Sequence, residues 1–199
     1  MARTRTAASR PWWVAVLLVC AWAAPIAAFA DEAVWKLLKG GGQVVLMRHA
    51  VTTPGVGDPE GMVLADCSTQ RNLSDEGRAH ARQIGEAFRA RSVAVTQLYS
   101  SPWCRCLETA RLAFRKDPEI SPALANLFGR SDPDGRQVAQ LRALASRKPA
   151  SGNVVMVTHG STVLALTGVS PATGEMVVLT PQGGGKFTVA GRLEVPGSR

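Results

Sequence analysis

The sequence predicts a single α/β domain in which helices flank a largely parallel β-sheet. Two apolar runs, residues 43–47 and 154–158, have the composition of buried strands. Segments with helical spacing lie between them, and chains that alternate strands with helices form parallel sheets. The first run leads into Arg48 and His49, and the second leads into His159. Because ligands bind beyond the carboxyl ends of strands in such sheets, we expect the functional site there.

The composition is that of a globular protein with a basic surface. The chain has 199 residues, of which 46% are hydrophobic and 19% are charged. Its formal net charge of +8 fits anionic partners such as phosphate esters, nucleic acids or anionic lipids, without choosing among them. The chain has no extended run of lysines and arginines, so we expect no nucleic-acid partner.

The N-terminus has the pattern of a secretory signal peptide. Arginines occur within residues 3–10, an uncharged apolar run covers residues 12–24, and Ala28-Phe29-Ala30 forms a cleavage motif. We predict a leader at residues 1–30, a mature domain at residues 31–199 and a periplasmic or secreted location. An uncleaved anchor is the alternative, but the run is shorter than the roughly 20 residues of a membrane span. No later segment is apolar for long enough, so we expect no stable span after cleavage.

Three cysteines follow the predicted leader: Cys67, Cys104 and Cys106. In an oxidising compartment an odd number allows one internal disulfide and leaves one free thiol. We predict that Cys67 pairs with Cys104 or Cys106. A bridge between Cys104 and Cys106 themselves would close a strained short loop. A zinc site or a cysteine nucleophile is the alternative. We expect no metal, because the chain has no Cys-x-x-C motif and only three histidines.

The segment between the two apolar runs is expected to hold two helices and a short strand. A short helix over residues 33–38 precedes the first strand, and a Gly- and Pro-rich loop follows it. Ser74 is the expected N-cap of an amphipathic helix over residues 75–90. Residues 97–100 have the composition of a strand, and Pro102 is expected to open the next helix. The expected buried face of that helix comprises Trp103, Leu107, Ala110 and Phe114.

The C-terminal part is expected to complete the sheet. Residues 117–136 have the composition of a loop, and the spacing of apolar residues from Val138 to Leu144 predicts a helix. A short helix is expected after His159. Residues 175–179 and 186–195 then form a hairpin around a glycine-rich turn.

The chemistry centres on the pair Arg48-His49. An imidazole can attack phosphorus and form a phosphohistidine. Its attacking nitrogen must be unprotonated, and a hydrogen bond from the other ring N–H to a backbone carbonyl enforces this. The planar guanidinium of arginine binds phosphate oxygens in a bidentate manner. Taken alone, the pair also fits a structural histidine beside a solvated arginine.

Two later motifs extend this pattern. Ser101-Pro102-Trp103-Cys104-Arg105 places Arg105 in the first turn of a helix, where phosphate binds readily. His159 directly follows the second apolar run and precedes Gly160, where a turn is expected. Each motif alone also fits a solvated or structural residue. Two histidines and two arginines at one sheet edge would, however, surround a phosphoryl group in transfer.

In this order the motifs closely resemble the histidine phosphatase superfamily, the branch that includes phosphoglycerate mutase-like enzymes. The resemblance covers residues 43–179 and includes the helix start Leu73-Ser74-x-x-Gly77. It implies a phosphoglycerate mutase-like three-layer sandwich with a mostly parallel sheet flanked by helices. It also implies that His49 is the nucleophile, that Arg48 and Arg105 bind phosphate, and that His159 stabilises the transferring group. No metal or organic cofactor is implied.

The sequence departs from the family pattern at two points. Ala50 stands where the first motif usually has glycine, a change that similar members tolerate. The mutase-type members have a glutamate acid between the positions of Arg105 and His159, and no matching glutamate is found here. Glu175 is the candidate replacement, with Asp132 and Asp134 as weaker ones. Without a strong acid, good leaving groups are favoured.

Two loop residues can be interpreted either as substrate ligands or as structural residues. Arg71 and Thr52 are candidate substrate ligands from the loop after the first strand, although both also fit a role in ordering that loop. His80 is expected on the exposed face of its helix, and Trp35 and Trp103 are expected in the core.

The sequence therefore predicts an exported phosphatase that acts on phosphomonoesters or phosphohistidine through a covalent intermediate. Its partner would be a small phosphorylated substrate or a phosphorylated envelope component. The first alternative is a phosphomutase with the same pocket. The second is a non-catalytic domain that binds polyanions or lipopolysaccharide on this fold, which predicts that at least one of the four pocket residues is displaced.

Overall fold

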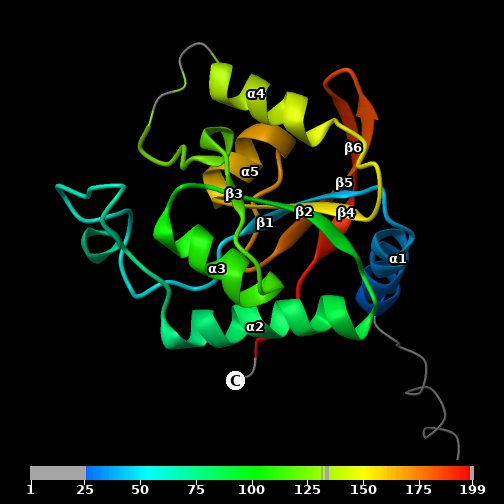
Figure 1. The fold of residues 1–199 in the computed structure, drawn as a ribbon, viewed down its shortest axis with the longest axis horizontal. Coiled ribbons are helices and arrows are strands. Elements are labelled where there is room, and N and C mark those ends of the chain that lie inside the picture. Colours follow the sequence, from blue (N-terminus) through cyan, green and yellow to red (C-terminus); the bar gives the residue numbers. More distant parts are fainter. Residues whose placement is uncertain (1–25, 131, 133–134, 198–199) are drawn as a thin grey trace, which may run out of the picture.

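The structure is a computed structural model that describes residues 26–130, 132 and 135–197 (Figure 1). The predicted leader lies largely outside these residues, so its cleavage stays a prediction. The first described element, α1, covers Ile26–Gly40 and is longer than the helix expected over residues 33–38.

A six-stranded sheet with the order β3-β2-β4-β1-β5-β6 forms the centre of the molecule. The strands are β1 (Val44–Arg48), β2 (Val95–Ser100), β3 (Glu119–Ile120), β4 (Asn153–Thr158), β5 (Met176–Gly183) and β6 (Lys186–Leu193). The first four strands run parallel, and β5 and β6 form an antiparallel hairpin at one side. The predicted mostly parallel sheet is confirmed.

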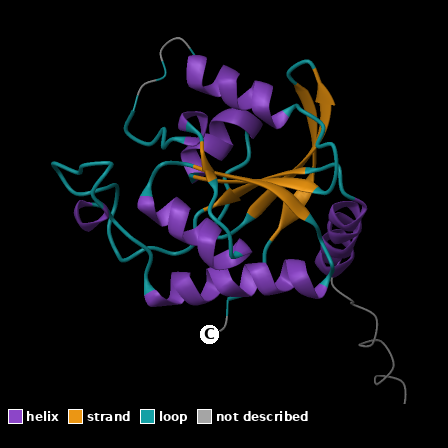
Figure 2. Cartoon of the chain, viewed as in Figure 1, coloured by secondary structure: helices purple, strands orange, loops and turns teal. Residues whose placement is uncertain are grey.

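Within the described ranges, five helices cover the two faces of the sheet (Figure 2). Besides α1 they are α2 (Asp75–Ala90), α3 (Cys104–Phe114), α4 (Arg136–Ala145) and α5 (Gly160–Thr167), and two single 3-10 turns lie at Cys67–Thr69 and Pro122–Leu124. One hydrophobic core joins α1, α2 and α3 to the sheet, and a second joins α4 and α5 to its other face. In β1, Val45 and Met47 enter the first core while Val44 and Leu46 enter the second. This alternation follows from the two-residue period of a strand and produces the predicted three-layer sandwich.

Local signals predicted most element boundaries. The Ser74 side chain accepts a hydrogen bond from the Gly77 backbone N–H at 3.1 Å, as expected of an N-cap. The 117–136 segment, expected as a loop, contains β3 and a 3-10 turn. A two-residue strand paired at a sheet edge has no periodicity to reveal it.

The expected orientation of α3 was partly wrong. The helix begins at Cys104, two residues after Pro102, and buries Arg105 and Thr109 on a face other than the expected apolar one. Leu107 and Phe114 are only half-buried. This burial results from tertiary packing, because the polar face of α3 lies against the ends of β1 and β4. There, Thr109 Oγ1 accepts a hydrogen bond from the Ala50 backbone N–H at 3.1 Å.

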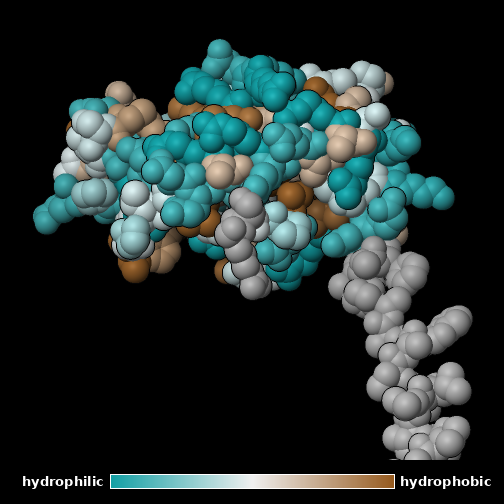
Figure 3. Space-filling view, turned by 90° about the horizontal axis from the view of Figure 1, so that it is seen from below, coloured by the Kyte–Doolittle hydropathy of each residue, from teal (hydrophilic) through white to brown (hydrophobic). Residues whose placement is uncertain are grey.

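The face of the molecule shown in Figure 3 is mainly hydrophilic, with small separate hydrophobic patches. Among the described residues, none of the helices has the length and apolarity that a membrane span requires.

Helices α2 and α3 approach closely at Gly85. A Cβ atom built at Gly85 would lie 1.8 Å from the Ala113 carbonyl oxygen, which belongs to the backbone of α3. No side chain fits this contact without moving one helix.

We therefore expect Gly85→Ala to destabilise the protein by about 1–3 kcal/mol, the usual cost of overpacking. In an open helix the same change would stabilise by roughly 1 kcal/mol. Urea denaturation measures the free energy of unfolding. Gly40→Ala is the control, since a Cβ there has nothing within 4 Å, and equal effects of the two changes would contradict this account of the contact.

Candidate active site

A cavity of about 410 Å³ opens beyond the carboxyl ends of β1 and β4. Its lining includes all four residues that the sequence placed in a phosphoryl pocket, together with Arg71. The full lining is Arg48, His49, Gly55, Val56, Gly57, Arg71, Arg105, Asn126, Phe128, His159, Gly160, Ser161, Leu164 and Ser170.

The first histidine, His49, follows β1 and is held by backbone hydrogen bonds. Its backbone N–H donates to the Thr158 carbonyl oxygen at 2.9 Å. Its ring Nδ1 lies 2.9 Å from the Ala50 carbonyl oxygen, which can only accept, so Nδ1 carries the proton and Nε2 carries the lone pair. Burial, with the charges of Arg105 and Arg48 in addition, lowers the pKa of His49 to about 3. The imidazole is therefore neutral near pH 7 with a basic Nε2, as a nucleophile requires.

The second histidine, His159, lies beside the first. The two ring centroids are 5.4 Å apart. Nδ1 of His159 is 3.5 Å from Nη2 of Arg105, a group that only donates, so Nδ1 is the acceptor. Nε2 is then protonated and donates to Ser101 Oγ at 2.8 Å. Burial and the neighbouring His49 and Arg105 lower the pKa of His159 well below its usual value.

The Arg105 side chain is 1% exposed and forms a bidentate ion pair. Its Nη1 donates to Asp58 Oδ1 at 2.6 Å and its Nη2 to Asp58 Oδ2 at 3.2 Å. The Nε–H of Arg105 is buried and has no hydrogen-bond partner among the described residues. The terminal edge of the guanidinium is thus occupied, while a donor on its other edge is left for a ligand.

Two further arginines of the cavity, Arg48 and Arg71, likewise have a paired terminal nitrogen and, among the described residues, an unpaired Nε–H. Arg48 Nη1 donates to the Pro171 carbonyl oxygen at 2.8 Å, and Arg71 Nη1 donates to the Gly55 carbonyl oxygen at 2.6 Å. The Nε–H of each is also buried and unpartnered within the described part of the chain. Buried polar groups are nearly always paired, so three orphan donors around one cavity mark a site for an anion.

Room for Arg48 comes from Gly160, the first residue of α5. A Cβ at Gly160 would lie 3.3 Å from both Cδ and Nε of Arg48. The glycine turn after His159 thus lets the guanidinium lie flat against the backbone.

Sequence reasoning missed Asp58, a loop residue with no distinguishing motif around it. Besides Arg105 it accepts hydrogen bonds from Trp103 Nε1 at 3.0 Å and from the Arg71 backbone N–H at 3.2 Å. Burial raises the pKa of Asp58, but the bonds and charge of Arg105 outweigh burial, and the net shift is downward. Asp58 is therefore a charged carboxylate that balances the basic cluster. Ser101 and Asn126 were also missed, although Ser101 belongs to the sequence motif that contains Arg105.

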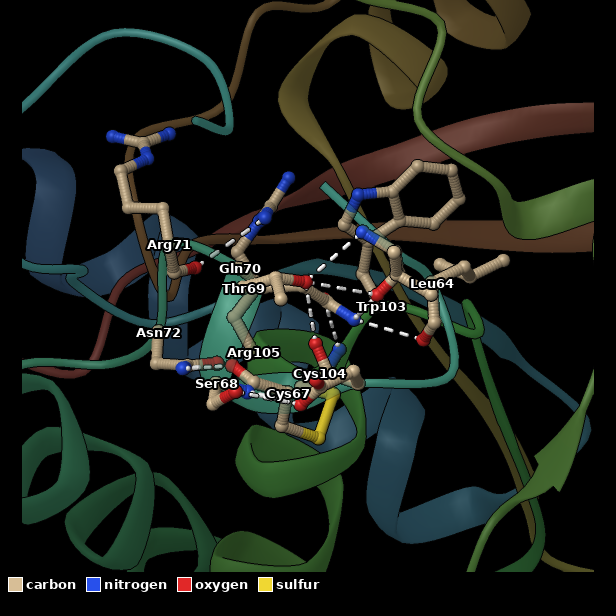
Figure 4. Close-up of a disulfide and its surroundings, with 12 residues drawn as sticks. Leu64, Cys67, Ser68, Thr69, Gln70, Arg71, Asn72, Trp103, Cys104 and Arg105 are labelled. Atoms are coloured by element: carbon tan, nitrogen blue, oxygen red, sulfur yellow. Dashed lines mark hydrogen bonds between the residues drawn. A yellow bond between two sulfur atoms is a disulfide. The ribbon is translucent and has the colours of Figure 1, made fainter. Parts of the chain in front are cut away.

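A disulfide ties the loop after β1 to the start of α3 (Figure 4). Cys67 pairs with Cys104, one of the two predicted partners, across a Cα–Cα distance of 5.7 Å. Gln70 Oε1 adds a hydrogen bond from the Cys104 backbone N–H at 3.0 Å. The remaining Cys106 is a free, buried thiol, and burial raises its pKa to about 12. A thiol of that pKa is unsuited to act as a nucleophile.

Glu175 lies outside the cavity lining. Its carboxylate forms an ion pair with Arg192, and its Oε2 accepts from the Ala172 backbone N–H at 2.6 Å. The hydrogen bond from Arg192 is the main cause of a lowered pKa at Glu175. A charged carboxylate in this pair has no proton to donate, so the placement favours a structural role over the predicted acid.

The remaining candidates within the described residues also lie outside the cavity lining. Thr52 forms a β-bridge with Leu73 and is absent from the lining, so the loop-ordering interpretation fits it better. Asp132 caps α4 through the Gln137 and Val138 backbone N–H groups, and Asp134 lies outside the described residues. His80, expected at the surface, is half-buried with Nε2 2.6 Å from the Val195 carbonyl oxygen. Within the described ranges no group of His, Cys, Asp and Glu is arranged to hold a metal ion.

Residues 44–131 match the family model of the histidine phosphatase superfamily (branch 1). These 88 of the 199 residues carry the sequence pattern of that superfamily. The matched segment includes Arg48, His49 and Arg105, and the resemblance drawn from the motifs is confirmed. No curated protein matches the sequence.

Several solved structures share the fold. The protein histidine phosphatase SixA, solved with tungstate, has 20% identity and a TM-score of 0.56, over 76% of this chain and 96% of that one. The Rv3214 protein of Mycobacterium tuberculosis has 20% identity and a TM-score of 0.54, over 74% and 95% of the two chains. A SixA protein of Agrobacterium tumefaciens has 19% identity and a TM-score of 0.53, over 78% and 99%. At this identity the likeness establishes the fold alone.

The buried neutral His49 makes stability depend on pH. Its folded pKa of about 3 lies below the ordinary value of 6.5. Between these values the unfolded chain binds more protons, so the free energy of unfolding falls as the pH drops from about 6.5 to 3. Each unit of difference corresponds to about 1.4 kcal/mol at most. Urea denaturation from pH 4 to 7 should show a shallower pH dependence for His49→Gln than for the unsubstituted protein, and identical slopes would contradict the buried neutral state.

Proposed function

We propose that this chain is a phosphatase that hydrolyses phosphomonoesters or phosphohistidine through a covalent phosphohistidine at His49. One observation carries the proposal, namely that a neutral imidazole with a free Nε2 shares a cavity with three arginines whose Nε–H groups are buried and unpartnered in the described structure. A phosphoryl group supplies both an electrophilic phosphorus and the oxygens that these donors lack. The structural relative SixA, a protein histidine phosphatase solved with tungstate, points the same way, since tungstate is an oxyanion.

In the first step Nε2 of His49 attacks phosphorus. The P–N bond forms as the bond to the leaving-group oxygen or nitrogen breaks, and that atom takes the electron pair. The guanidinium groups of Arg48 and Arg105 would stabilise the charge on the equatorial oxygens. His159 would contribute little charge while the site is empty, but a dianionic ligand favours its protonated form, which then adds a donor at Nδ1.

In the second step water attacks the phosphorus of the phosphohistidine. The P–N bond breaks, inorganic phosphate leaves, and His49 returns to its neutral form. No carboxylate belongs to the cavity lining within the described residues, so the leaving group would take its proton from water. This favours leaving groups of low basicity, including the imidazole of phosphohistidine.

We further propose that the protein acts in the periplasm or outside the cell. The charge and hydropathy pattern of residues 1–30 supports this location. The Cys67–Cys104 disulfide supports it as well, because disulfides persist mainly in oxidising compartments. N-terminal sequencing of the purified mature protein should give Asp31 as its first residue, and retention of residues 1–30 would contradict the cleavage.

The test of the phosphatase is release of inorganic phosphate from p-nitrophenyl phosphate. We expect His49→Ala to lower kcat by about a thousand-fold or more, as loss of a nucleophile does. His80→Ala is the matched control and should retain full turnover, because His80 lies outside the cavity. An acid-labile phosphoprotein should form with radiolabelled substrate and be absent from His49→Ala.

Two results would overturn the proposal. Full turnover by His49→Ala would reject the nucleophile. Phosphate binding without any turnover by the unsubstituted protein would favour the non-catalytic polyanion-binding alternative.

A further inference from the structure

Three exposed apolar side chains surround the mouth of the cavity. Val56 is 88% exposed, Phe128 is 58% exposed and Leu164 is 46% exposed, and all three line the cavity. They come from separate segments, namely the loop after β1, the loop before α4 and helix α5. Single exposed apolar residues are common on protein surfaces, but a cluster at the rim of a polar pocket marks a contact site for a ligand.

The backbone on each side of Val56 is fixed by an arginine of the cavity. The Arg71 side chain donates to the carbonyl oxygen of Gly55, directly before Val56. Two residues after Val56, Asp58 is fixed by its ion pair with Arg105. The basic residues of the pocket floor therefore also position the apolar rim.

Phe128 is fixed by a separate set of hydrogen bonds. Its backbone N–H donates to Asn126 Oδ1 at 3.0 Å, and the same oxygen accepts from Ser161 Oγ of α5 at 2.9 Å. A Cβ built at Gly57 would lie 3.9 Å from Cε1 of Phe128, so the ring reaches the loop that carries Val56. The Phe128 ring therefore lies next to the loop that carries Val56.

The cavity has room for more than a phosphoryl group. Its volume of about 410 Å³ lies in the range of sites for whole small molecules. Since the histidines and arginines form one end, the remainder of the substrate would lie among the rim residues. Acidic side chains are absent from the lining in the described structure, so a cationic leaving group finds no partner there.

From this arrangement, and resting on the proposed phosphatase function, we infer that the protein selects phosphomonoesters with an apolar leaving group. The rim residues Val56, Phe128 and Leu164 contact that group, while the arginines hold the phosphoryl oxygens.

The test compares two phosphate esters that differ only in polarity. They are 4-propylphenyl phosphate and 4-(2-hydroxyethyl)phenyl phosphate, which have the same charge, nearly the same size and phenols that ionise near the value of tyrosine, about 10. We expect kcat/KM to be at least about 4-fold higher for the propyl ester, the worth of one buried methylene.

The variants Val56→Ser and Phe128→Ser should lower kcat/KM for the propyl ester by a larger factor than for the hydroxyethyl ester, because the rim loses its apolar contact with the propyl group. Val189→Ser is the matched control, because Val189 is 43% exposed on β6 and does not line the cavity. It should preserve the preference.

Equal kcat/KM for the two esters in the unsubstituted protein would overturn the inference, and so would an equal loss for both esters in the rim variants. If neither these esters nor p-nitrophenyl phosphate is hydrolysed, the phosphatase proposal fails instead. Calorimetric binding of both esters to the His49→Ala variant then tests the rim independently, and equal Kd values would reject it.

Discussion

The site depends on the parallel pairing of β1 with β4. Their register aligns Arg48 with Thr158, and the His49 backbone N–H donates to the Thr158 carbonyl oxygen. Parallel strands end at the same edge of a sheet, so this pairing brings together two histidines that are 110 positions apart in the sequence. If β1 shifted by one residue relative to β4, the Arg48 and His49 side chains would each turn to the other face of the sheet. The pocket would then be lost.

Charge balance imposes the second constraint. Arg105 is almost fully buried, and a buried charge is tolerated only when it is paired and hydrogen-bonded. Asp58 meets this requirement with a bidentate contact while leaving the Nε–H of Arg105 without a partner. The loop that carries Asp58 is in turn tied to α3 by the Cys67–Cys104 disulfide. Covalent and ionic contacts therefore hold the same loop against the same helix, and the loop projects from the body of the molecule beyond them (Figure 1).

The predictions from sequence succeeded where the determining interactions are local. The strand composition, the Ser74 cap and the spacing along α2 are readable within a few residues, and each element was found in the structure. The motifs also predicted which histidines and arginines meet, because the ends of parallel strands share an edge. They did not predict the ion pair of Glu175, because its partner, Arg192, comes from the neighbouring antiparallel strand. They failed for the orientation of α3 because a polar face is buried there against other polar groups.

The sequence by itself determined the fold class, the nucleophile candidate and the basic pocket, since periodicity and motif order are properties of the chain. Only the tertiary structure decided that Asp58 neutralises Arg105, that Cys67 bonds to Cys104 and that Thr52 and Glu175 lie outside the cavity. It also decided that Val56, Phe128 and Leu164 meet at one rim. These outcomes depend on the paths of long loops, whose shape is set by contacts with distant residues and leaves no periodic pattern in the sequence.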